Sequence, residues 1–304
     1  MRRPAQNICV VECRPEIEKS NLTRGTSMNK IKMAVTAVSI ALTSVAFGPS
    51  AHAGEVLDRI LASKTLRVAA GADWGLIAHL DEKNELVGYD IDVAKGIAKY
   101  LGVKAEFVTP GWDLIAAGNW AGRWDIGTGQ MAPTKARADK FDFSVPYFYD
   151  RTIIVVHKDS KAAKASDLDG KVVGVNGGTV AEAYANQTHT PDDPNAQPVH
   201  YDFKAGEVKT YGNSTIAFDD LRLGDGVRLD AVITDETFTE GAIKSGYPLK
   251  IIERLFPLPA AIPMMKGDKE LVEKVSAAIK SMRDDGTLSK LSVKWYGSDH
   301  SVAQ

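Results

Sequence analysis

The chain has 304 residues, of which 44% are hydrophobic and 25% are charged, as expected for a protein with a packed core. The formal net charge of −2 and the lack of a basic stripe argue against a nucleic-acid partner. The length predicts one large domain or two of moderate size.

The N-terminal 53 residues have the pattern of a segment that is removed. Lys30 and Lys32 precede an uncharged, mostly apolar run over 33–47, and the stretch ends in Ala-His-Ala at 51–53. Residues 28–53 therefore predict a cleavable signal peptide. A membrane anchor is the alternative, but the apolar run is short of the ~20 residues that a span needs. Residues 1–27 are interpreted as an over-extended start site.

The two cysteines, Cys9 and Cys13, lie in this N-terminal extension. They make a weak metal or redox pair, because no His or further Cys accompanies them. An exported chain that begins at Gly54 would have no cysteine, and therefore no disulfide and no lipid anchor on a cysteine. We expect such a chain to be mildly acidic and to carry no cofactor.

Strand-like and helix-like segments alternate along the rest of the chain. Strands are predicted over 65–70, 104–108, 123–129, 151–158 and 228–235, and helices over 90–102, 112–122, 134–140 and 268–286, with a strand, loop and helix over 167–185. The last helix places Leu271, Val275, Ala278 and Met282 on one face. This alternation predicts an α/β protein with mostly parallel strands and helices on both faces of the sheets.

One polar segment, 186–209, interrupts the alternation and has little periodicity. A structureless stretch of this length is either functional or a surface excursion. It holds the one conceivable metal cluster of the sequence, formed by His189, Asp192, Asp193 and His200. Their spacing fits no common site, so we expect no bound metal.

Residues 129–137, GQMAPTKAR, allow two interpretations. In the first, Thr134 caps a helix, Pro133 fixes the approach of the chain and Arg137 faces solvent. In the second, Arg137 is held at this place to bind a carboxylate, which a guanidinium recognises through paired hydrogen bonds. The segment alone does not decide between them.

A glycine-rich turn and a strand end carry further candidates. Gly178 and Thr179 stand where a strand turns into a helix, and free amide hydrogens at such a point suit an anion. A plain tight turn fits these residues equally well. Asp235 ends a strand, where α/β folds place ligand groups, although it could instead cap the next helix.

Two tryptophans, Trp74 and Trp112, each follow a predicted strand. They either pack in the core or form flat walls for a ligand. Taken together, the candidates match a free α-amino acid: Arg137 and the Gly178–Thr179 amides would bind its carboxylate, Asp235 its ammonium, and the tryptophans its side chain. Catalytic residues are not expected, since no nucleophile motif is present.

Several segments carry a resemblance to one family. GYDIDVAKGIAKYL at 88–101 is similar to the signature of the extracytoplasmic solute-binding proteins of polar amino-acid ABC transporters. The similarity extends in the family's order through 121–148, 170–179, 228–235 and 282–297, and covers essentially all of 66–297. It implies the type II periplasmic-binding-protein fold, in which two α/β lobes are joined by two hinge strands and the ligand lies in the interlobe cleft.

The resemblance also implies lobe limits. The first lobe is expected to comprise residues 54–150 and 258–304, and the second lobe residues 151–257. The chain would cross between them twice, near 149–152 and near 257–262.

Matched position by position, the resemblance assigns roles to the candidates. Arg137 corresponds to the carboxylate-binding arginine of the family's Thr-x-x-Arg motif, and Asp235 to its ammonium-binding aspartate. Thr179 corresponds to the second-lobe Gly-Thr that meets the carboxylate. Trp74 and Trp112 fall where the family has aromatic or apolar walls.

The chain departs from the family pattern at several of these positions. Ala132 replaces a Ser or Thr, Gly129 and Gln130 replace other polar residues, and Val180 replaces a Thr. The main-chain amides over 129–132 remain as donors for a carboxylate. Gln130 and Asn176 are candidates for binding an amide or hydroxyl of the ligand side chain.

The resemblance implies a periplasmic, monomeric protein that captures an amino acid and delivers it to permease subunits in the inner membrane. One alternative is a periplasmic cyclohexadienyl (prephenate) dehydratase-type enzyme on the same fold. It would need a general acid, for which Glu236 beside Asp235 is the candidate. A second alternative is a sensor partner that presents the ligand to a receptor.

Overall fold

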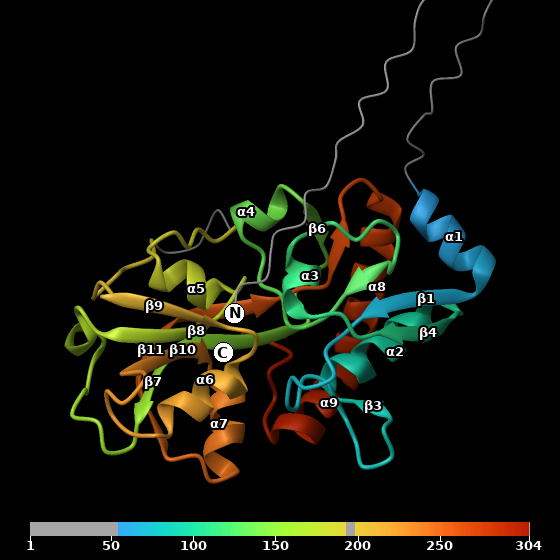
Figure 1. Cartoon of the computed structure of the whole chain (residues 1–304). Coiled ribbons are helices and arrows are strands. Elements are labelled where there is room, and N and C mark those ends of the chain that lie inside the picture. Colours follow the sequence, from blue (N-terminus) through green and yellow to red (C-terminus); the bar gives the residue numbers. More distant parts are fainter. Residues whose placement is uncertain (1–53, 193–197, 304) are drawn as a thin grey trace, which may run out of the picture. The chain divides into compact units, whose positions relative to one another are not determined.

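The computed structural model describes residues 54–192 and 198–303, which belong to one compact unit (Figure 1). The predicted start-site extension and signal peptide, residues 1–53, lie outside the described residues, as does Asp193. In the described ranges, no helix is both long enough and apolar enough to cross a membrane.

The first sheet is built from short strands near both ends of the described chain. Its order is β4 (Lys104–Val108), β1 (Thr65–Ala69), β5 (Ile126–Gly127), β12 (Pro263–Met265) and β6 (Phe141–Phe143). β4, β1 and β5 are parallel, whereas β12 is antiparallel to both of its neighbours. A separate hairpin pairs β2 (His79–Leu80) with β3 (Leu86–Val87).

The second sheet uses strands from the middle of the chain. Its order is β11 (Leu249–Ala260), β7 (Phe148–His157), β10 (Ala231–Asp235), β8 (Val172–Asn176) and β9 (Glu207–Tyr211). β10, β8 and β9 are parallel, and β7 is antiparallel to β10 and β11. The predicted α/β class is confirmed, and the prediction of mostly parallel strands holds in part, since half of the strand pairings in the two five-stranded sheets are parallel and half are antiparallel. β7, β11 and β12 run against their neighbours because the chain passes to the second sheet along β7 and returns along β11.

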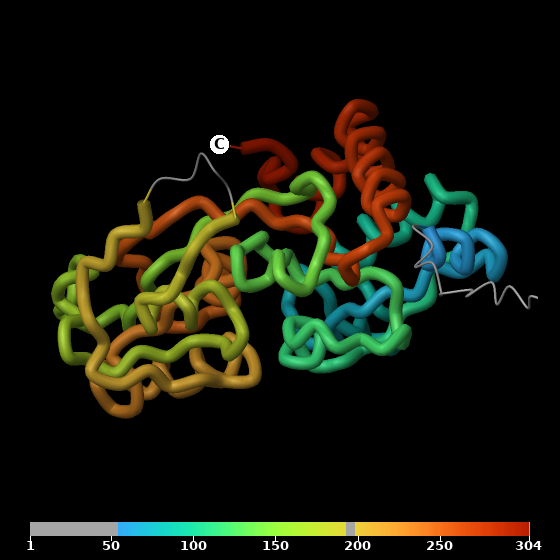
Figure 2. The backbone as a smooth tube through the Cα atoms, turned by 90° about the horizontal axis from the view of Figure 1, so that it is seen from above, coloured from blue at the N-terminus to red at the C-terminus, as the bar shows by residue number. Residues whose placement is uncertain are grey.

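The long strands β7 and β11 connect the two sheets. Their antiparallel pairing extends from His157 opposite Leu249 to Phe148 opposite Ala260. Figure 2 shows the green segment near residue 150 and the orange segment near residue 258 running together between the two halves of the unit. We call the first sheet with its helices the first lobe, and the second sheet with its helices the second lobe. The exact lobe limits stay a prediction, because both strands run continuously through them.

Helices cover both faces of each sheet. In the first lobe they are α1 (Glu55–Ser63), α2 (Tyr89–Leu101), α3 (Trp112–Ala116), α4 (Lys135–Ala138), α8 (Lys269–Asp284) and α9 (Thr287–Tyr296). In the second lobe they are α5 (Val180–Ala185), α6 (Ser214–Leu221) and α7 (Glu236–Lys244), with a 3₁₀ turn at Ala165–Leu168. Along β7, Ile154 packs in one apolar cluster with α5 and Ile153 in another with α6, as alternation on a strand requires.

The predicted apolar face of α8 is confirmed. Leu271, Val275, Ala278 and Met282 are all buried in the cluster that α8 shares with α2 and β1. The helix predicted over 112–122 is too long, since α3 ends at Ala116. Gly118 follows with a φ of 72°, a left-handed conformation that stops a helix and that glycine adopts at little cost.

The polar segment 186–209 contains no helix or strand in its described part before β9 begins at Glu207. It does contact the first lobe, because the Lys135 N–H donates to the Thr190 carbonyl at 3.2 Å and Thr134 forms an isolated bridge with Pro191. The described part of the segment therefore reaches the neighbourhood of α4.

Candidate ligand-binding site

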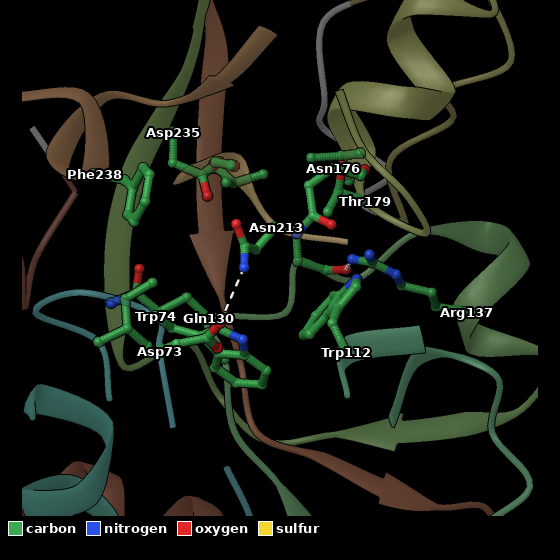
Figure 3. A pocket seen from close by; sticks show the side chains of 16 residues that line it. Asp73, Trp74, Trp112, Gln130, Arg137, Asn176, Thr179, Asn213, Asp235 and Phe238 are labelled. Atoms are coloured by element: carbon green, nitrogen blue, oxygen red, sulfur yellow. Dashed lines mark hydrogen bonds between the residues drawn. The ribbon is translucent and has the colours of Figure 1, made fainter. Parts of the chain in front are cut away.

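A cavity of about 80 Å³ lies between the lobes, and its lining comes from both (Figure 3). The lining residues are Asp73, Trp74, Ile77, Trp112, Gly129, Gln130, Ala132 and Arg137 of the first lobe, Asn176, Thr179, Val180, Asn213, Ser214, Asp235 and Phe238 of the second, and Leu258 on β11. All the predicted ligand-binding residues except Gly178 are among them. Gly178 lines a neighbouring cavity that also borders Arg137.

Arg137 is positioned by the short helix α4. The Thr134 hydroxyl accepts a hydrogen bond from the Arg137 main-chain N–H at 3.3 Å, which confirms the predicted cap. The guanidinium turns inward: Nη1 donates to the Ala132 carbonyl at 2.7 Å, and Nη2 donates across the lobes to the Gly178 carbonyl at 2.9 Å. Loss of hydration lowers the pKa of Arg137 to about 10, so it stays charged at neutral pH. The solvent-facing interpretation is wrong.

Asp235 faces the same cavity from the end of β10. Its side chain makes no capping hydrogen bond to α7, so capping does not explain its position. Burial raises the pKa of its carboxyl to about 7; the charge of Asp150 acts in the same direction and that of Arg137 opposes it. Among the ion pairs of residues 54–192 and 198–303, none joins Asp235 to Arg137. Figure 3 shows the two side chains on different sides of the cavity.

Trp74 and Trp112 form one wall of the cavity. Their rings meet edge to face, with centroids 5.9 Å apart and an interplanar angle of 79°. Both also pack in an apolar cluster of the first lobe, so core packing and wall formation are not exclusive. Gly129 has a φ of 104°, and a Cβ on it would lie 2.8 Å from a carbon of each ring. Only glycine fits at this position without displacing the tryptophans.

A buried carboxylate holds the turn that carries Gly129 and Gln130. Asp90, fully buried at the start of α2, accepts hydrogen bonds from the Gly129 N–H at 2.6 Å, the Gln130 N–H at 3.3 Å and the Tyr147 hydroxyl at 2.9 Å. Burial raises the pKa of Asp90 to about 6. The turn needs this support because Gln130, a non-glycine residue, has a φ of 51°.

These hydrogen bonds correct one prediction. The amides of Gly129 and Gln130 are already paired, so they are not free for a ligand carboxylate as the sequence suggested. The Gln130 side chain is engaged as well, because Nε2 donates to the Tyr296 hydroxyl at 2.8 Å. In the second lobe, the Gly178 N–H donates to Glu182 Oε2 at 2.7 Å.

Thr179 caps α5, and Asn176 ends β8 three residues before it. The Thr179 hydroxyl accepts from the Glu182 N–H at 3.4 Å and donates to the Asn176 carbonyl at 2.6 Å. Thr179 is therefore a helix cap that also borders the cavity, and the Asn176 side chain points toward the same space in Figure 3.

Asp73, Asn213 and Phe238 line the cavity and were missed by the sequence reasoning. Asn213 caps α6 through Oδ1, and its Nδ2 donates to Asp73 Oδ2 at 3.0 Å across the lobes. An Asn before a helix predicts the cap, but nothing local indicates the contact with the other lobe. Phe238 follows Asp235 by three residues on α7, a spacing that could have placed it on the same side.

The described residues considered for a dehydratase and for a metal site do not line the cavity. Glu236 pairs with Arg254, with Oε1 2.6 Å from Nε, and does not line the cavity. His189 is buried against Phe256, with ring centroids 4.8 Å apart. Within the described ranges, no group of three or more His, Cys, Asp or Glu side chains is arranged to hold a metal ion.

Comparison with known proteins relates this site to a family. The model of the bacterial extracellular solute-binding proteins, family 3, matches residues 66–298. A probable amino-acid ABC transporter-binding protein of Haemophilus influenzae is 29% identical over 261 residues, which cover 84% of this chain and 94% of that protein.

Solved structures show the same two-lobed fold. An ancestral amino acid-binding protein, described as a precursor of cyclohexadienyl dehydratase, is 34% identical with a TM-score of 0.68, covering 79% of this chain and 99% of that one. An ancestral arginine-binding protein bound to arginine is 36% identical with a TM-score of 0.66, covering 77% of this chain and 99% of that one. The type II periplasmic-binding-protein fold predicted from the sequence is confirmed.

The role of Asp90 predicts a specific loss of stability. Asp90→Ala removes the acceptor of the Gly129 N–H and of the Tyr147 hydroxyl, and one of the two acceptors of the Gln130 N–H, so the free energy of unfolding should fall by at least about 2 kcal/mol. Asp90→Asn should lose less, because an amide oxygen can accept in place of Oδ2. Urea denaturation measures both variants.

The control is Asp92→Ala, on the same helix, whose partly exposed carboxylate pairs with Lys294 at 2.7 Å and accepts from the Trp295 indole N–H at 2.9 Å, two partners that are themselves partly exposed. We expect it to cost less than about 1 kcal/mol. Equal losses in Asp90→Ala and Asp92→Ala would contradict the supporting role of Asp90.

Proposed function

Because the chain belongs to family 3 of the bacterial extracellular solute-binding proteins, we propose that it captures a free amino acid and delivers it to an ABC-transporter permease. One observation carries the proposal: a guanidinium and a carboxylate face a single interlobe cavity from different lobes and are not paired with each other. An α-amino acid has the complementary pair of charges. Arg137 would bind its carboxylate and Asp235 its ammonium, each through charge-assisted hydrogen bonds.

The second acid of the cavity favours a ligand with a hydrogen-bond-donating side chain. Asp73 lies beside Asn213 and, in the described part of the chain, is in no ion pair. Because Arg137 would bind the α-carboxylate of the ligand and Asp235 its α-ammonium, Asp73 would be available to bind the ligand side chain. A cationic side chain would balance the charge, so L-arginine is the first ligand to test.

We propose that the protein acts in the periplasm as a monomer, after removal of the predicted signal peptide at 28–53, and that permease subunits are its partners. A dehydratase is the second candidate, because a 34% identical ancestral protein is described as a precursor of cyclohexadienyl dehydratase. The pairing of Glu236 with Arg254 speaks against that reading, since it occupies the expected general acid. Turnover of prephenate by the purified protein would support it.

A thermal-shift screen tests the proposed function. We expect at least one of the twenty common L-amino acids, or L-cystine, to raise the melting temperature, because a ligand at a hundred times its Kd adds about 2.7 kcal/mol of stability. If none of them raises it at millimolar concentration, amino-acid capture is the wrong function.

Arg137 should provide most of the carboxylate recognition. Arg137→Ala should weaken the binding of the amino acid by at least about a hundredfold, or about 2.7 kcal/mol, because the carboxylate loses its charged partner in a closed cavity. Arg137→Lys should recover part of this loss, since an ammonium cannot make the planar fork. Calorimetric titration measures the three affinities.

Arg222→Ala is the matched control, because it removes a guanidinium that is paired with Asp219 at the surface of the second lobe. The affinity of Arg222→Ala for the amino acid should stay within about twofold of that of the unsubstituted protein. Near-parental affinity of Arg137→Ala, with melting curves that show a folded protein, would rule out the proposed carboxylate site.

Binding should also depend on pH through Asp235. Its pKa is raised to about 7, and only the ionised form attracts the ligand ammonium. The affinity should therefore be highest above pH 7 and fall by up to about tenfold per pH unit as the pH drops toward 5. Calorimetry at pH 8, 7, 6 and 5 gives the profile. Asp235→Asn should bind weakly with a flat profile, and a parental affinity that is constant from pH 8 to 5 would contradict this role.

A further inference from the structure

The helix that follows Asp235 is capped by a residue of another strand. Asp150, on β7, is only 7% exposed. Its Oδ2 accepts from the Thr237 hydroxyl at 2.5 Å, and its Oδ1 accepts from the Thr237 main-chain N–H at 3.3 Å. Thr237 is the second residue of α7, so this N–H has no acceptor within the helix. Asp150 therefore acts as a cap from outside the helix.

The strand register explains how Asp150 reaches α7. β10 ends at Asp235, which is opposite Thr152 in the antiparallel ladder with β7. β7 extends past this pair to Asp150, whereas the chain turns into α7 after Asp235. Two further steps along the ladder place Asp150 beside Thr237. The Arg151 N–H also donates to Asp150 Oδ1, at 2.7 Å, which helps to fix the carboxylate.

Asp235 has the backbone conformation of a capping residue but does not cap. Its φ of −87° and ψ of 144° are extended, as is usual just before a helix. Aspartate is among the preferred capping side chains, yet the Asp235 carboxyl lines the cavity and Asp150 bonds to Thr237 instead. After burial, the charge of Asp150 is the second cause that raises the pKa of Asp235, so the two carboxylates repel each other at this helix end.

We propose that Asp150 is a positioning residue for ammonium recognition: it caps α7 in place of Asp235 and so leaves the Asp235 carboxylate to face the cavity. The inference rests on the proposed function, because it presupposes that Asp235 binds the ammonium of the ligand. Without Asp150, the Thr237 N–H would lack an acceptor, and Asp235 stands where a side chain can supply one. A carboxylate that turned onto the helix end would be lost to the ligand.

Asp268 supplies a matched control. It is 6% exposed and caps α8, where its Oδ1 accepts from the Leu271 N–H at 2.9 Å. Its Oδ2 accepts from the N–H groups of Val56 and Leu57, so it has three donors, as Asp150 has. Asp268 belongs to the first lobe and does not line the cavity. Its loss should therefore lower stability without moving a ligand group.

Calorimetric titration with L-arginine, L-histidine, L-glutamine and L-cystine compares the unsubstituted protein with Asp150→Ala, Asp150→Asn and Asp268→Ala. The titrations are made at pH 8, because burial raises the pKa of Asp150 to about 6 and that of Asp235 to about 7, and both carboxyl groups are then mostly ionised. In Asp150→Asn, Oδ1 can still accept from the N–H groups of Arg151 and Thr237, and Nδ2 can donate to the Thr237 hydroxyl. This variant therefore keeps the cap and removes the charge.

For the amino acid that binds, we expect Asp150→Ala to raise Kd at least about tenfold, and melting curves show that the variant is folded. Asp150→Asn and Asp268→Ala should stay within about threefold of the unsubstituted protein. Equal affinity changes in Asp150→Ala and Asp268→Ala would overturn the inference. An equal loss in Asp150→Ala and Asp150→Asn would overturn it as well, because the charge and not the cap would then matter.

A double-mutant cycle separates positioning from a general loss of structure. In Asp235→Ala no carboxylate remains to be positioned, so adding Asp150→Ala should change Kd by less than about twofold. If Asp150→Ala costs as much affinity in Asp235→Ala as it does in the unsubstituted protein, Asp150 acts by another route and the inference fails.

Hydrogen exchange tests the cap without a ligand and without a change at Asp150. The Thr237 amide should stay protected in Asp235→Ala, because its acceptor is Asp150. Exchange that is more than about tenfold faster in this variant would identify Asp235 as the cap and contradict the inference. If an amino acid binds and Asp150→Ala binds it equally well, the inference fails and the proposed function stands. If none of the four binds, the proposed function fails for these ligands and the inference fails with it.

Discussion

A guanidinium and a carboxylate that face one cavity without neutralising each other are the constraint on which the rest of the site depends. Removal from water lowers the pKa of Arg137 and raises that of Asp235, so both ions are less favourable here than in solution. A zwitterionic amino acid between them would give each ion its counter-charge. The same electrostatics would favour closing of the lobes around the ligand and explain why neither lobe can make the site alone.

The fold serves this arrangement by holding the site residues of each lobe in place and by linking the two lobes through paired strands. On the first lobe, Thr134 starts the helix of Arg137, and Asp90 holds the Gly129–Gln130 turn against the tryptophans. On the second lobe, Asp235 stands at the end of a central strand. β7 and β11 pass side by side between the sheets, so a change in their twist would move the two charges relative to each other.

Much of this could be predicted from the sequence, because the signals are local. The cap at Thr134, the buried face of α8 and the strand that ends at Asp235 follow from periodicity and from residue preferences over a few positions. Asp235 was found because charged residues at the ends of α/β strands are good candidates for ligand groups. For Arg137 the segment alone left two interpretations open, and the Thr-x-x-Arg motif of the family favoured carboxylate binding.

The predictions that failed, and the site residues that were missed, involve contacts between segments that are distant in the sequence. The hydrogen bond from Asn213 to Asp73 joins residues of different lobes, and neither residue carries a local sign of it. The amides of Gly129 and Gln130 looked free because the sequence does not show that Asp90 folds onto them. Strand direction was misjudged in part for a similar reason, since the return of the chain along β11 is a long-range feature.

The most direct test of the two-charge account uses ligands that each lack one charge. Calorimetry would compare L-arginine with L-argininamide, which has no carboxylate, and with 5-guanidinopentanoate, which has no α-ammonium. The account predicts that both analogues bind at least about a hundredfold more weakly than L-arginine, a difference of about 2.7 kcal/mol in each case. Binding of either analogue within about threefold of L-arginine would contradict recognition of the zwitterion by Arg137 and Asp235.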